Sequence, residues 1–162
     1  MKLIFNSKYD VFNNAYSLYL VRDFLEGSYI LEGDLFLKES VFCEQSTAKS
    51  NYFVKNLETL KEEWIVTKDS NSKIIDIHVG VVGEKDYISA GMTYLSENDG
   101  STMRNVFEGL DFNTLSPDIY WDNILKDNLC NLEIFAKVIP EHTVFEIDDL
   151  EDYQNLKIKF ND

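Results

Sequence analysis

The segment SPDIYWDN, residues 116–123, gathers side chains that can do chemistry. It combines two carboxylates and an amide with the rings of Tyr120 and Trp121. A plain surface turn would not need so large an aromatic pair beside the acids. Pro117 restricts the backbone and a helical pattern follows, so we expect Asp122 to lie at a helix start. The segment therefore predicts a binding site whose ligand depends on residues elsewhere in the chain.

A second acid, Asp34, follows a predicted buried strand in the stretch YILEGD. Open α/β sheets bind ligands beyond the carboxyl ends of their strands. Carboxylates from separate elements can share one Mg²⁺, whose other positions go to water and phosphate oxygens, so Asp34 and Asp122 are candidate metal ligands. The alternative is that Asp34 belongs to a turn and that Asp122 is a first-turn acid suiting the helix dipole. Spacing alone favours this alternative, because acids are common at such positions.

The composition limits what the chain can bind. Its 162 residues suit a single domain, residues 1–162, and 44% of them are apolar, which argues against disorder. The formal charge of −14 repels phosphate backbones and anionic headgroups, so we expect no nucleic-acid partner and no membrane partner. The two cysteines form no CxxC pair, and no apolar run approaches the roughly 20 residues of a membrane span. These features favour a cytoplasmic protein.

Alternating patterns predict a mixed α/β fold in one piece. We expect strands at residues 2–5, 28–34, 51–56, 62–69, 73–80, 86–96, 132–140 and 143–148. We expect helices at residues 13–27, 101–110, 120–128 and 149–160. The turn-forming stretch DSNSK, residues 69–73, predicts a hairpin between the strands on either side of it.

Several stretches, taken in order, resemble one known family. They are LIFNSKYDVFNNAYSLYLVRDFLEGSYILEGD at 3–34, EEWIV at 62–66, ISAGMTYL at 88–95, DIYWDN at 118–123 with LKDN at 125–128, and VFEIDDLEDY at 144–153. Together they resemble the bacterial CTP:phosphocholine cytidylyltransferases of the lic-operon type, over nearly the whole chain. The resemblance implies a partial Rossmann-like nucleotidyltransferase fold, with a mixed β-sheet flanked by helices.

The resemblance also implies a reaction. A phosphomonoester oxygen, from phosphocholine or a similar molecule, attacks the α-phosphorus of CTP or another NTP, and pyrophosphate leaves. By position, Asp34 and Asp122 match the carboxylates that hold the Mg²⁺ and serve as catalytic residues, while Glu32 departs from the family in side-chain length. Asn13 and Asn14 fall where relatives bring a helix start near the nucleotide, and simple N-capping is the alternative.

Four aromatic residues are candidates for binding the choline head group: Trp64, Tyr94, Tyr120 and Trp121. A trimethylammonium group cannot donate ordinary N–H hydrogen bonds and is held by aromatic faces, at roughly 0.5–2 kcal/mol each. The alternative for Trp64 and Tyr94 is the sheet core, where strand aromatics usually lie.

The resemblance has one large gap. Relatives begin with a strand and a glycine-rich G-x-G-x-R-x-x-P loop that wraps the triphosphate, whereas this sequence contains no G-x-G. We therefore expect a truncated domain whose transferase activity needs the missing part. A non-catalytic module that binds choline phosphate and an inactive remnant are the alternatives.

The gap also predicts self-association. In the family fold the missing strands pair with the strand that residues 2–5 match, so here that strand would become an edge that recruits another strand. The helix at 13–27 would expose apolar surface around Leu18, Val21 and Leu25. We expect a homodimer that buries this truncated face.

Overall fold

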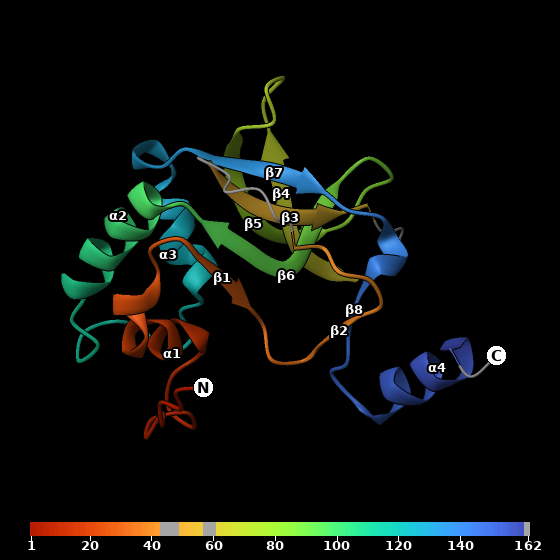
Figure 1. Ribbon diagram of the computed structural model, residues 1–162, viewed down its shortest axis with the longest axis horizontal. Helices are drawn as coiled ribbons and strands as arrows, with labels where there is room; N and C mark the ends of the chain where they lie inside the picture. The colour runs from red at the N-terminus through yellow and green to blue at the C-terminus, as the bar shows by residue number, and fades with distance from the viewer. Residues whose placement is uncertain (43–48, 57–60, 161–162) are drawn as a thin grey trace.

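The computed structural model describes residues 1–42, 49–56 and 61–160, and its centre is a six-stranded mixed sheet (Figure 1). The strands are β1 (Ser28–Leu31), β2 (Leu35–Leu37), β3 (Ser50–Lys55), β4 (Glu62–Lys68), β5 (Ile74–Val81), β6 (Tyr87–Leu95), β7 (Ile134–Val138) and β8 (Val144–Glu146). The α-helices are α1 (Asn14–Leu20), α2 (Glu97–Glu108), α3 (Trp121–Asp127) and α4 (Leu150–Phe160). The expected mixed α/β class, with a sheet flanked by helices, is confirmed.

Strand β6 pairs with other strands along both of its edges. Along one edge it pairs with β3, and β3 in turn pairs with β7 in parallel. The other edge is shared, because β1 pairs with residues 92–95 and β4 with residues 87–88. Residues 89–91 therefore lie between the end of β1 and the start of β4. We call this place the split.

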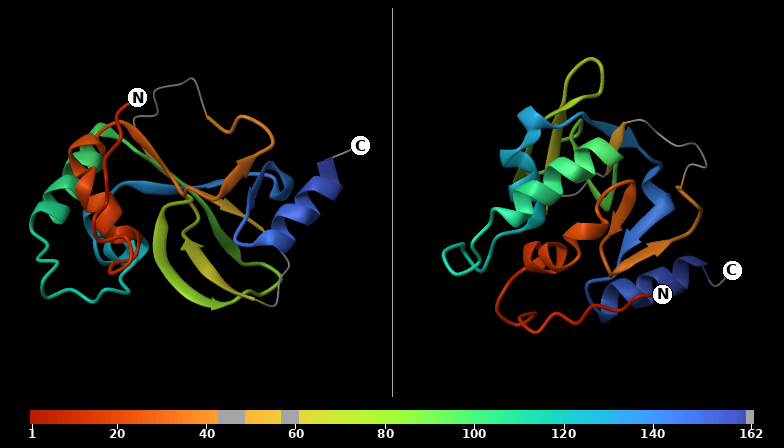
Figure 2. Two further views of the ribbon diagram at one scale, coloured as in Figure 1. Left: turned by 90° about the horizontal axis from the view of Figure 1, so that it is seen from below. Right: turned by 60° about the vertical axis from the view of Figure 1, so that its left-hand side comes forward.

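Helices α1, α2 and α3 lie together on one side of the sheet, and α4 lies at the opposite end of the molecule (Figures 1 and 2). The main core forms between the first three helices and the sheet. Its fully buried members include Tyr52 on β3, Leu95 on β6, Phe107 on α2 and Leu125 on α3. A smaller cluster on the opposite face packs β6 against Val144 of the two-stranded sheet formed by β2 and β8.

The hairpin expected around residues 69–73 is confirmed. Strands β4 and β5 pair antiparallel on either side of this turn. The Asp69 carboxylate accepts hydrogen bonds from the backbone N–H groups of Asn71 and Lys73, each at 2.8 Å. An aspartate that satisfies backbone donors in this way stabilises a tight turn, which is why the sequence pattern was informative here.

The prediction of a strand at residues 2–5 is wrong. These residues form no strand, and no described strand pairs with them. Leu3 and Phe5 are 82% and 83% exposed. A short apolar run becomes a strand only where another strand pairs with it, and hydrophobicity alone does not supply that partner.

The apolar surface expected on the first helix is smaller than predicted. Leu25 is only 2% exposed, and Leu18 and Val21 are half-buried. The helix itself is shorter than expected, because α1 ends at Leu20 and a 3-10 turn, Arg22–Phe24, follows it. Tightening of the chain after α1 directs Leu25 into the core.

Among the described residues, no helix combines the length and hydrophobicity needed to cross a membrane.

Candidate functional site

A cleft of about 750 Å³ opens at the split. Its walls come from α1, from the end of β1, from the start of β4, from the start of α3 and from the end of β8. The lining residues are Asn13, Asn14, Ser17, Leu18, Val21, Ile30, Leu31, Glu32, Gly33, Asp34, Glu63, Trp64, Tyr120, Trp121, Glu146 and Asp148. The cleft exists because β1 and β4 separate beside β6 and leave the edge of residues 89–91 uncovered by a strand.

The structure brings most of the residues singled out from the sequence to this cleft. Those that line it are Asn13, Asn14, Asp34, Trp64, Tyr120 and Trp121. Asp122 is 3% exposed and lies behind the lining, close enough to Glu32 to raise its pKa. Tyr94 lies away from the cleft, on the other face of the sheet, where its ring is 4.9 Å from that of Tyr29.

Trp64 and Tyr120 form an aromatic pair in the cleft. Their ring centroids are 5.6 Å apart at an interplanar angle of 66°, an edge-to-face arrangement. Trp64 is brought there by the start of β4, and Tyr120 precedes the first residue of α3. Tyr120 is 38% exposed, so part of its ring remains available to a ligand. An edge-to-face arrangement of this kind is favourable for two aromatic rings and holds each ring against the other.

Trp121 has a different environment from its neighbour. It is 5% exposed and stacks on Tyr52, with ring centroids 6.2 Å apart and an interplanar angle of 29°. Its backbone N–H donates to the Asn14 side-chain oxygen at 2.9 Å. Trp121 therefore holds the start of α3 against β3 and α1, and it contributes only a small area to the cleft.

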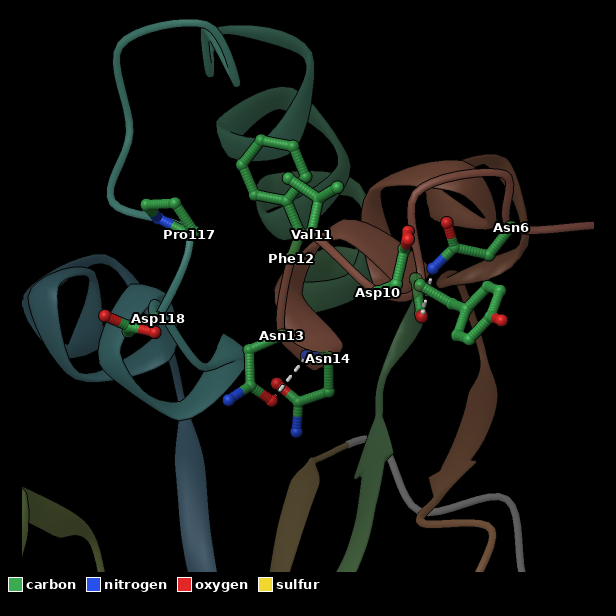
Figure 3. Close-up of a pocket in the computed structure, with 10 residues that line it drawn as sticks. Asn6, Asp10, Val11, Phe12, Asn13, Asn14, Pro117 and Asp118 are labelled. Carbon is green, nitrogen blue, oxygen red and sulfur yellow. Dashed lines mark hydrogen bonds between the residues drawn. The ribbon is translucent and has the colours of Figure 1, made fainter.

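Asn13 and Asn14 both have structural roles at the start of α1. The Asn13 side chain accepts a hydrogen bond from the Asn14 N–H at 2.8 Å, so the capping alternative is realised (Figure 3). A second hollow of about 400 Å³, whose lining includes Asn6, Pro117 and Asp118, shares Asn13, Asn14 and Ser17 with the cleft. These two amides therefore stand where the two hollows meet.

Carboxylates dominate the electrostatics of the cleft. The pKa of Glu32 is raised to about 7, first by burial and then by the negative charges of Asp122, Glu146, Asp34 and Asp148. Burial likewise raises the pKa of Glu146, although the charge of Lys55 opposes the rise. Acids that raise one another's pKa are short of positive charge, and the cleft therefore attracts cations.

Asp122 is held by a buried tyrosine. The Tyr52 hydroxyl donates to Asp122 Oδ1 at 2.6 Å, and both residues are nearly inaccessible to solvent. Burial raises the pKa of Asp122 to about 6, while the bond from Tyr52 works in the opposite direction. At neutral pH the carboxylate is therefore mostly ionised, and its charge contributes to raising the pKa of Glu32.

At Gly91, the side chains of Leu35 and Glu32 approach the backbone of β6 closely. Its φ is +67°, and a Cβ atom there would lie 2.9 Å from Leu35 Cδ2 and 3.0 Å from Glu32 Oε2. Its carbonyl accepts a hydrogen bond from the Glu32 N–H at 3.0 Å. The pairing of β3 with β6 is also irregular here, since the register shifts between Tyr52 and Val54. Such bulges commonly redirect side chains beside functional sites.

Sequence reasoning missed three acids of the cleft, Glu63, Glu146 and Asp148, and left the role of Glu32 open. Glu146 lies in the apolar run VFEI, and a charged residue within such a strand was the available signal. Glu63 gave no comparable signal, because it follows another acid, Glu62, at the start of β4, where the strand is least buried.

The donor atoms of the cleft suit a hard cation such as Mg²⁺. They are carboxylate oxygens with no sulfur or imidazole among them. Within the described ranges, no three acidic, histidine or cysteine side chains form a ready-made metal cage.

Comparison with known proteins places this geometry in a family, although no protein-family model matches the chain. The chain is 32% identical over 160 residues to the choline-phosphate cytidylyltransferase of Streptococcus pneumoniae. The match covers 97% of this chain and 67% of that protein. The chain belongs to the choline-phosphate cytidylyltransferase family. A second cytidylyltransferase of this name, from Haemophilus influenzae, is 26% identical over 156 residues, covering 95% of this chain and 66% of its own length.

Solved structures agree with this family. The CTP:phosphocholine cytidylyltransferase from Streptococcus pneumoniae has a TM-score of 0.88 and 29% identity, covering 98% of this chain and 68% of that one. The inositol-1-phosphate CTP transferase from T. maritima, at 18% identity and a TM-score of 0.60, shares the fold. The expected Rossmann-like nucleotidyltransferase fold is confirmed. The chain spans about two thirds of the length of its curated cytidylyltransferase relatives.

Proposed function

We propose that this chain binds the acceptor and the metal for transfer of a cytidylyl group from CTP to phosphocholine. In that reaction a phosphate oxygen of phosphocholine attacks the α-phosphorus of CTP. The new P–O bond forms as the bond between the α-phosphorus and the oxygen leading to the β-phosphate breaks, and pyrophosphate leaves. Such chemistry depends mainly on in-line positioning and on neutralising charge.

The observation that carries the proposal is the aromatic pair of Trp64 and Tyr120 inside an acidic cleft. A trimethylammonium group cannot donate N–H hydrogen bonds, and aromatic faces with nearby carboxylates are its usual binding site. Glu63 adjoins Trp64 in the cleft wall, and Glu146 supplies another, half-buried acid. The same negative charge repels a free phosphate, so a zwitterion with a cationic end fits better than a sugar phosphate.

Asp34 and Asp122 are the residues that would hold the Mg²⁺. Asp34 is exposed in the turn between β1 and β2, Asp122 is buried behind the lining, and both act electrostatically on Glu32. When bound, Mg²⁺ neutralises phosphate charge and orients the triphosphate. Asn13 and Asn14, where the two hollows meet, are the candidates to approach the nucleotide.

We expect the chain alone not to complete the reaction at a useful rate. The sequence contains no G-x-G loop to wrap the triphosphate. Losing one preorganised charge-stabilising group typically costs roughly 10²–10³ in rate, and the glycine-rich loop supplies several. Activity would then need the missing part, whether it is supplied by another chain or by a longer product.

A second candidate function is a binding module that holds choline phosphate without catalysis. It is favoured by one observation: the aromatic pair and the acids around it all belong to this chain. The acceptor half of the site therefore needs no further polypeptide.

Isothermal titration with phosphocholine and with CTP plus Mg²⁺ separates the possibilities. Binding of both ligands supports the transferase, and binding of phosphocholine alone supports the module. Binding of neither ligand contradicts both and leaves an inactive remnant. A parallel assay of pyrophosphate release from CTP and phosphocholine should show no robust turnover, and fast release by the pure chain would overturn the expectation of dependence on a missing part.

A further inference from the structure

The segment that carries Tyr120 is bonded to the start of α1 at both of its ends. The Asn13 N–H donates to the Pro117 carbonyl at 2.9 Å. The Trp121 N–H donates to Asn14 Oδ1, also at 2.9 Å. Two consecutive residues at the start of α1 thus hold the connection from Pro117 to Trp121, and Figure 3 shows the Pro117 end of this connection beside them.

The bond to Asn14 satisfies a donor at the start of α3. Trp121 is the first residue of this helix, and the first N–H groups of a helix have no intrahelical backbone partner. The preceding N–H, of Tyr120, donates to Asn123 Oδ1 within α3 at 3.0 Å. The Trp121 N–H instead takes its acceptor from α1, 107 positions away in the sequence. The position of the peptide between Tyr120 and Trp121 is therefore set by α1.

The place of the Tyr120 ring depends on this peptide. Tyr120 lies just before α3 and is 38% exposed, so packing restrains its ring only in part. The ring meets Trp64 edge to face, with centroids 5.6 Å apart. Trp64 is fixed in β4 by strand pairing. The geometry of the aromatic pair therefore depends on where the start of α3 is held.

We propose that Asn14 is a positioning residue that holds the Tyr120 ring against Trp64 and thereby sets a preference for a trimethylammonium head group over a primary ammonium. The inference rests on the proposed function, in which this pair binds the head group. A trimethylammonium group depends on aromatic faces, whereas a primary ammonium can also donate hydrogen bonds to a carboxylate such as Glu63. Displacing the Tyr120 ring therefore weakens binding of the first group more than binding of the second.

Two replacements separate this role from direct contact with a ligand. Asn14→Asp keeps a side-chain oxygen that accepts from Trp121 and removes the Nδ2 donor, whereas Asn14→Leu removes both. Phosphocholine and phosphoethanolamine are titrated into each variant, and the ratio of the two affinities cancels the effect of an added charge that both ligands feel alike. We expect Asn14→Leu to reduce the preference for phosphocholine about three- to tenfold, and Asn14→Asp to retain it.

Hydrogen exchange at the Trp121 amide, followed by nuclear magnetic resonance, reports on the bond itself without any ligand. We expect exchange about 2- to 10-fold faster in Asn14→Leu than in the parent, and parental exchange in Asn14→Asp. Asn105→Leu, at an exposed amide on α2 outside the cleft lining, is the matched control and should change neither measurement.

The outcomes distinguish this inference from the proposed function. A parent chain that does not bind phosphocholine contradicts both. A parent that binds it, with an unchanged preference in Asn14→Leu, overturns this inference alone. Equal loss of both ligands in Asn14→Leu also overturns it, because a general disturbance of the cleft acts that way. Loss of the preference in Asn14→Asp with a protected Trp121 amide overturns it too, because Nδ2 then acts on the ligand directly. If Asn14→Leu does not give the circular dichroism spectrum of the parent, Asn14→Ala decides the matter by the same ratio.

Discussion

At the scale of single residues, the cleft concentrates carboxylates that repel one another. Glu32 is the centre of this group, because four other acids contribute to raising its pKa to about 7. Because the protein does not neutralise these negative charges, the cleft favours a cationic ligand. The same arrangement has a cost in the free protein, since an ionised Glu32 is less stable in the fold than in the unfolded chain.

The first prediction is that the stability of the protein depends on pH because of the titration of Glu32. Its pKa is about 7 in the fold against an ordinary value of 4.5. The folded state therefore binds more protons than the unfolded state between these values, and the free energy of unfolding falls as the pH rises from about 4.5 to about 7. Glu32→Gln removes this loss, and we expect the variant to be more stable than the parent by about 1 kcal/mol at pH 8, after allowance for solvent screening, and nearly equal to it at pH 4.5.

Urea unfolding at the two pH values measures this difference. Glu84→Gln, at an exposed acid in the loop between β5 and β6, controls for the loss of one negative charge. If Glu32→Gln and Glu84→Gln behave alike at both pH values, Glu32 carries no special strain.

The second prediction concerns the aromatic pair. Trp64→Ala and Tyr120→Ala should each weaken phosphocholine binding by roughly 0.5–2 kcal/mol, because each removes one ring from the cation site. Tyr120→Phe keeps the ring and should bind nearly as well as the parent. Phe42→Ala, at an exposed ring that packs on Tyr29, is the control for loss of an aromatic side chain elsewhere. Titration calorimetry gives the affinities of the parent and the four variants, and a loss in Tyr120→Phe equal to that in Tyr120→Ala would show that the ring is not the binding feature.

Individual site residues were predictable only where a local signal existed. Tyr120 and Asp122 stand in a segment whose composition is unusual by itself, and Asp34 follows a recognisable strand. Tyr52 reads as an ordinary strand aromatic, and only the fold shows that its hydroxyl meets Asp122. Tyr94 illustrates the converse, since which face of β6 it occupies could not be read from the sequence before the pairing partners were known.

At the scale of elements, the site forms at the split, where β1 and β4 pair with different parts of one edge of β6. The end of β1 supplies Glu32, and the start of β4 supplies Glu63 and Trp64. Two strands that pair with different halves of one edge meet end to end, so their terminal side chains converge. The irregular stretch of β6 at Gly91 leaves room for them.

The third prediction tests this stretch. Gly91→Ala places a methyl group 2.9 Å from Leu35 Cδ2 and 3.0 Å from Glu32 Oε2, at a φ of +67° that L residues rarely adopt. We expect a loss of about 1–2 kcal/mol in the free energy of unfolding. Gly109→Ala is the matched control, with a φ of −81° and the nearest contact at 3.5 Å. Equal stability of the two variants by urea unfolding would contradict the close approach at Gly91.

Most elements were predictable, and the exceptions have a common cause. The hairpin of β4 and β5 follows from turn chemistry, which is local. Strand β2 was missed because three residues give no periodicity, and its existence depends on β8 more than 100 positions later. Residues 2–5 look like a strand and lack a partner among the described residues. Strand pairing depends on residues that lie far apart in the sequence, so a short apolar run alone does not predict it.

At the scale of the whole molecule, the first residues leave apolar surface in contact with solvent. Leu3 and Phe5 are more than 80% exposed, and Phe24 is 49% exposed. Lys2, Ile4, Val21 and Phe24 line a hollow of about 370 Å³. Although the expected edge strand is absent, this surface still supports the proposal that the face associates with a second copy.

The fourth prediction is therefore a dimer of the 18.8 kDa chain in light scattering coupled to size exclusion. Leu3→Lys combined with Phe5→Lys should shift the mass to the monomer, because the two changes place charge on the face that the proposed dimer would bury. Ile158→Lys, at a 75% exposed position on α4, should not. A parent chain that stays monomeric at every concentration tested would contradict the dimer.

The central claim is that the cleft at the split binds phosphocholine, and a titration with matched ligands tests it most directly. Phosphocholine and phosphoethanolamine carry the same phosphate and differ in the ammonium head, which the pair of Trp64 and Tyr120 should distinguish. The account predicts saturable calorimetric binding of phosphocholine by the parent chain, weaker binding of phosphoethanolamine, and loss of this difference in Trp64→Ala. No binding of phosphocholine, or equal binding of the two ligands, would contradict it.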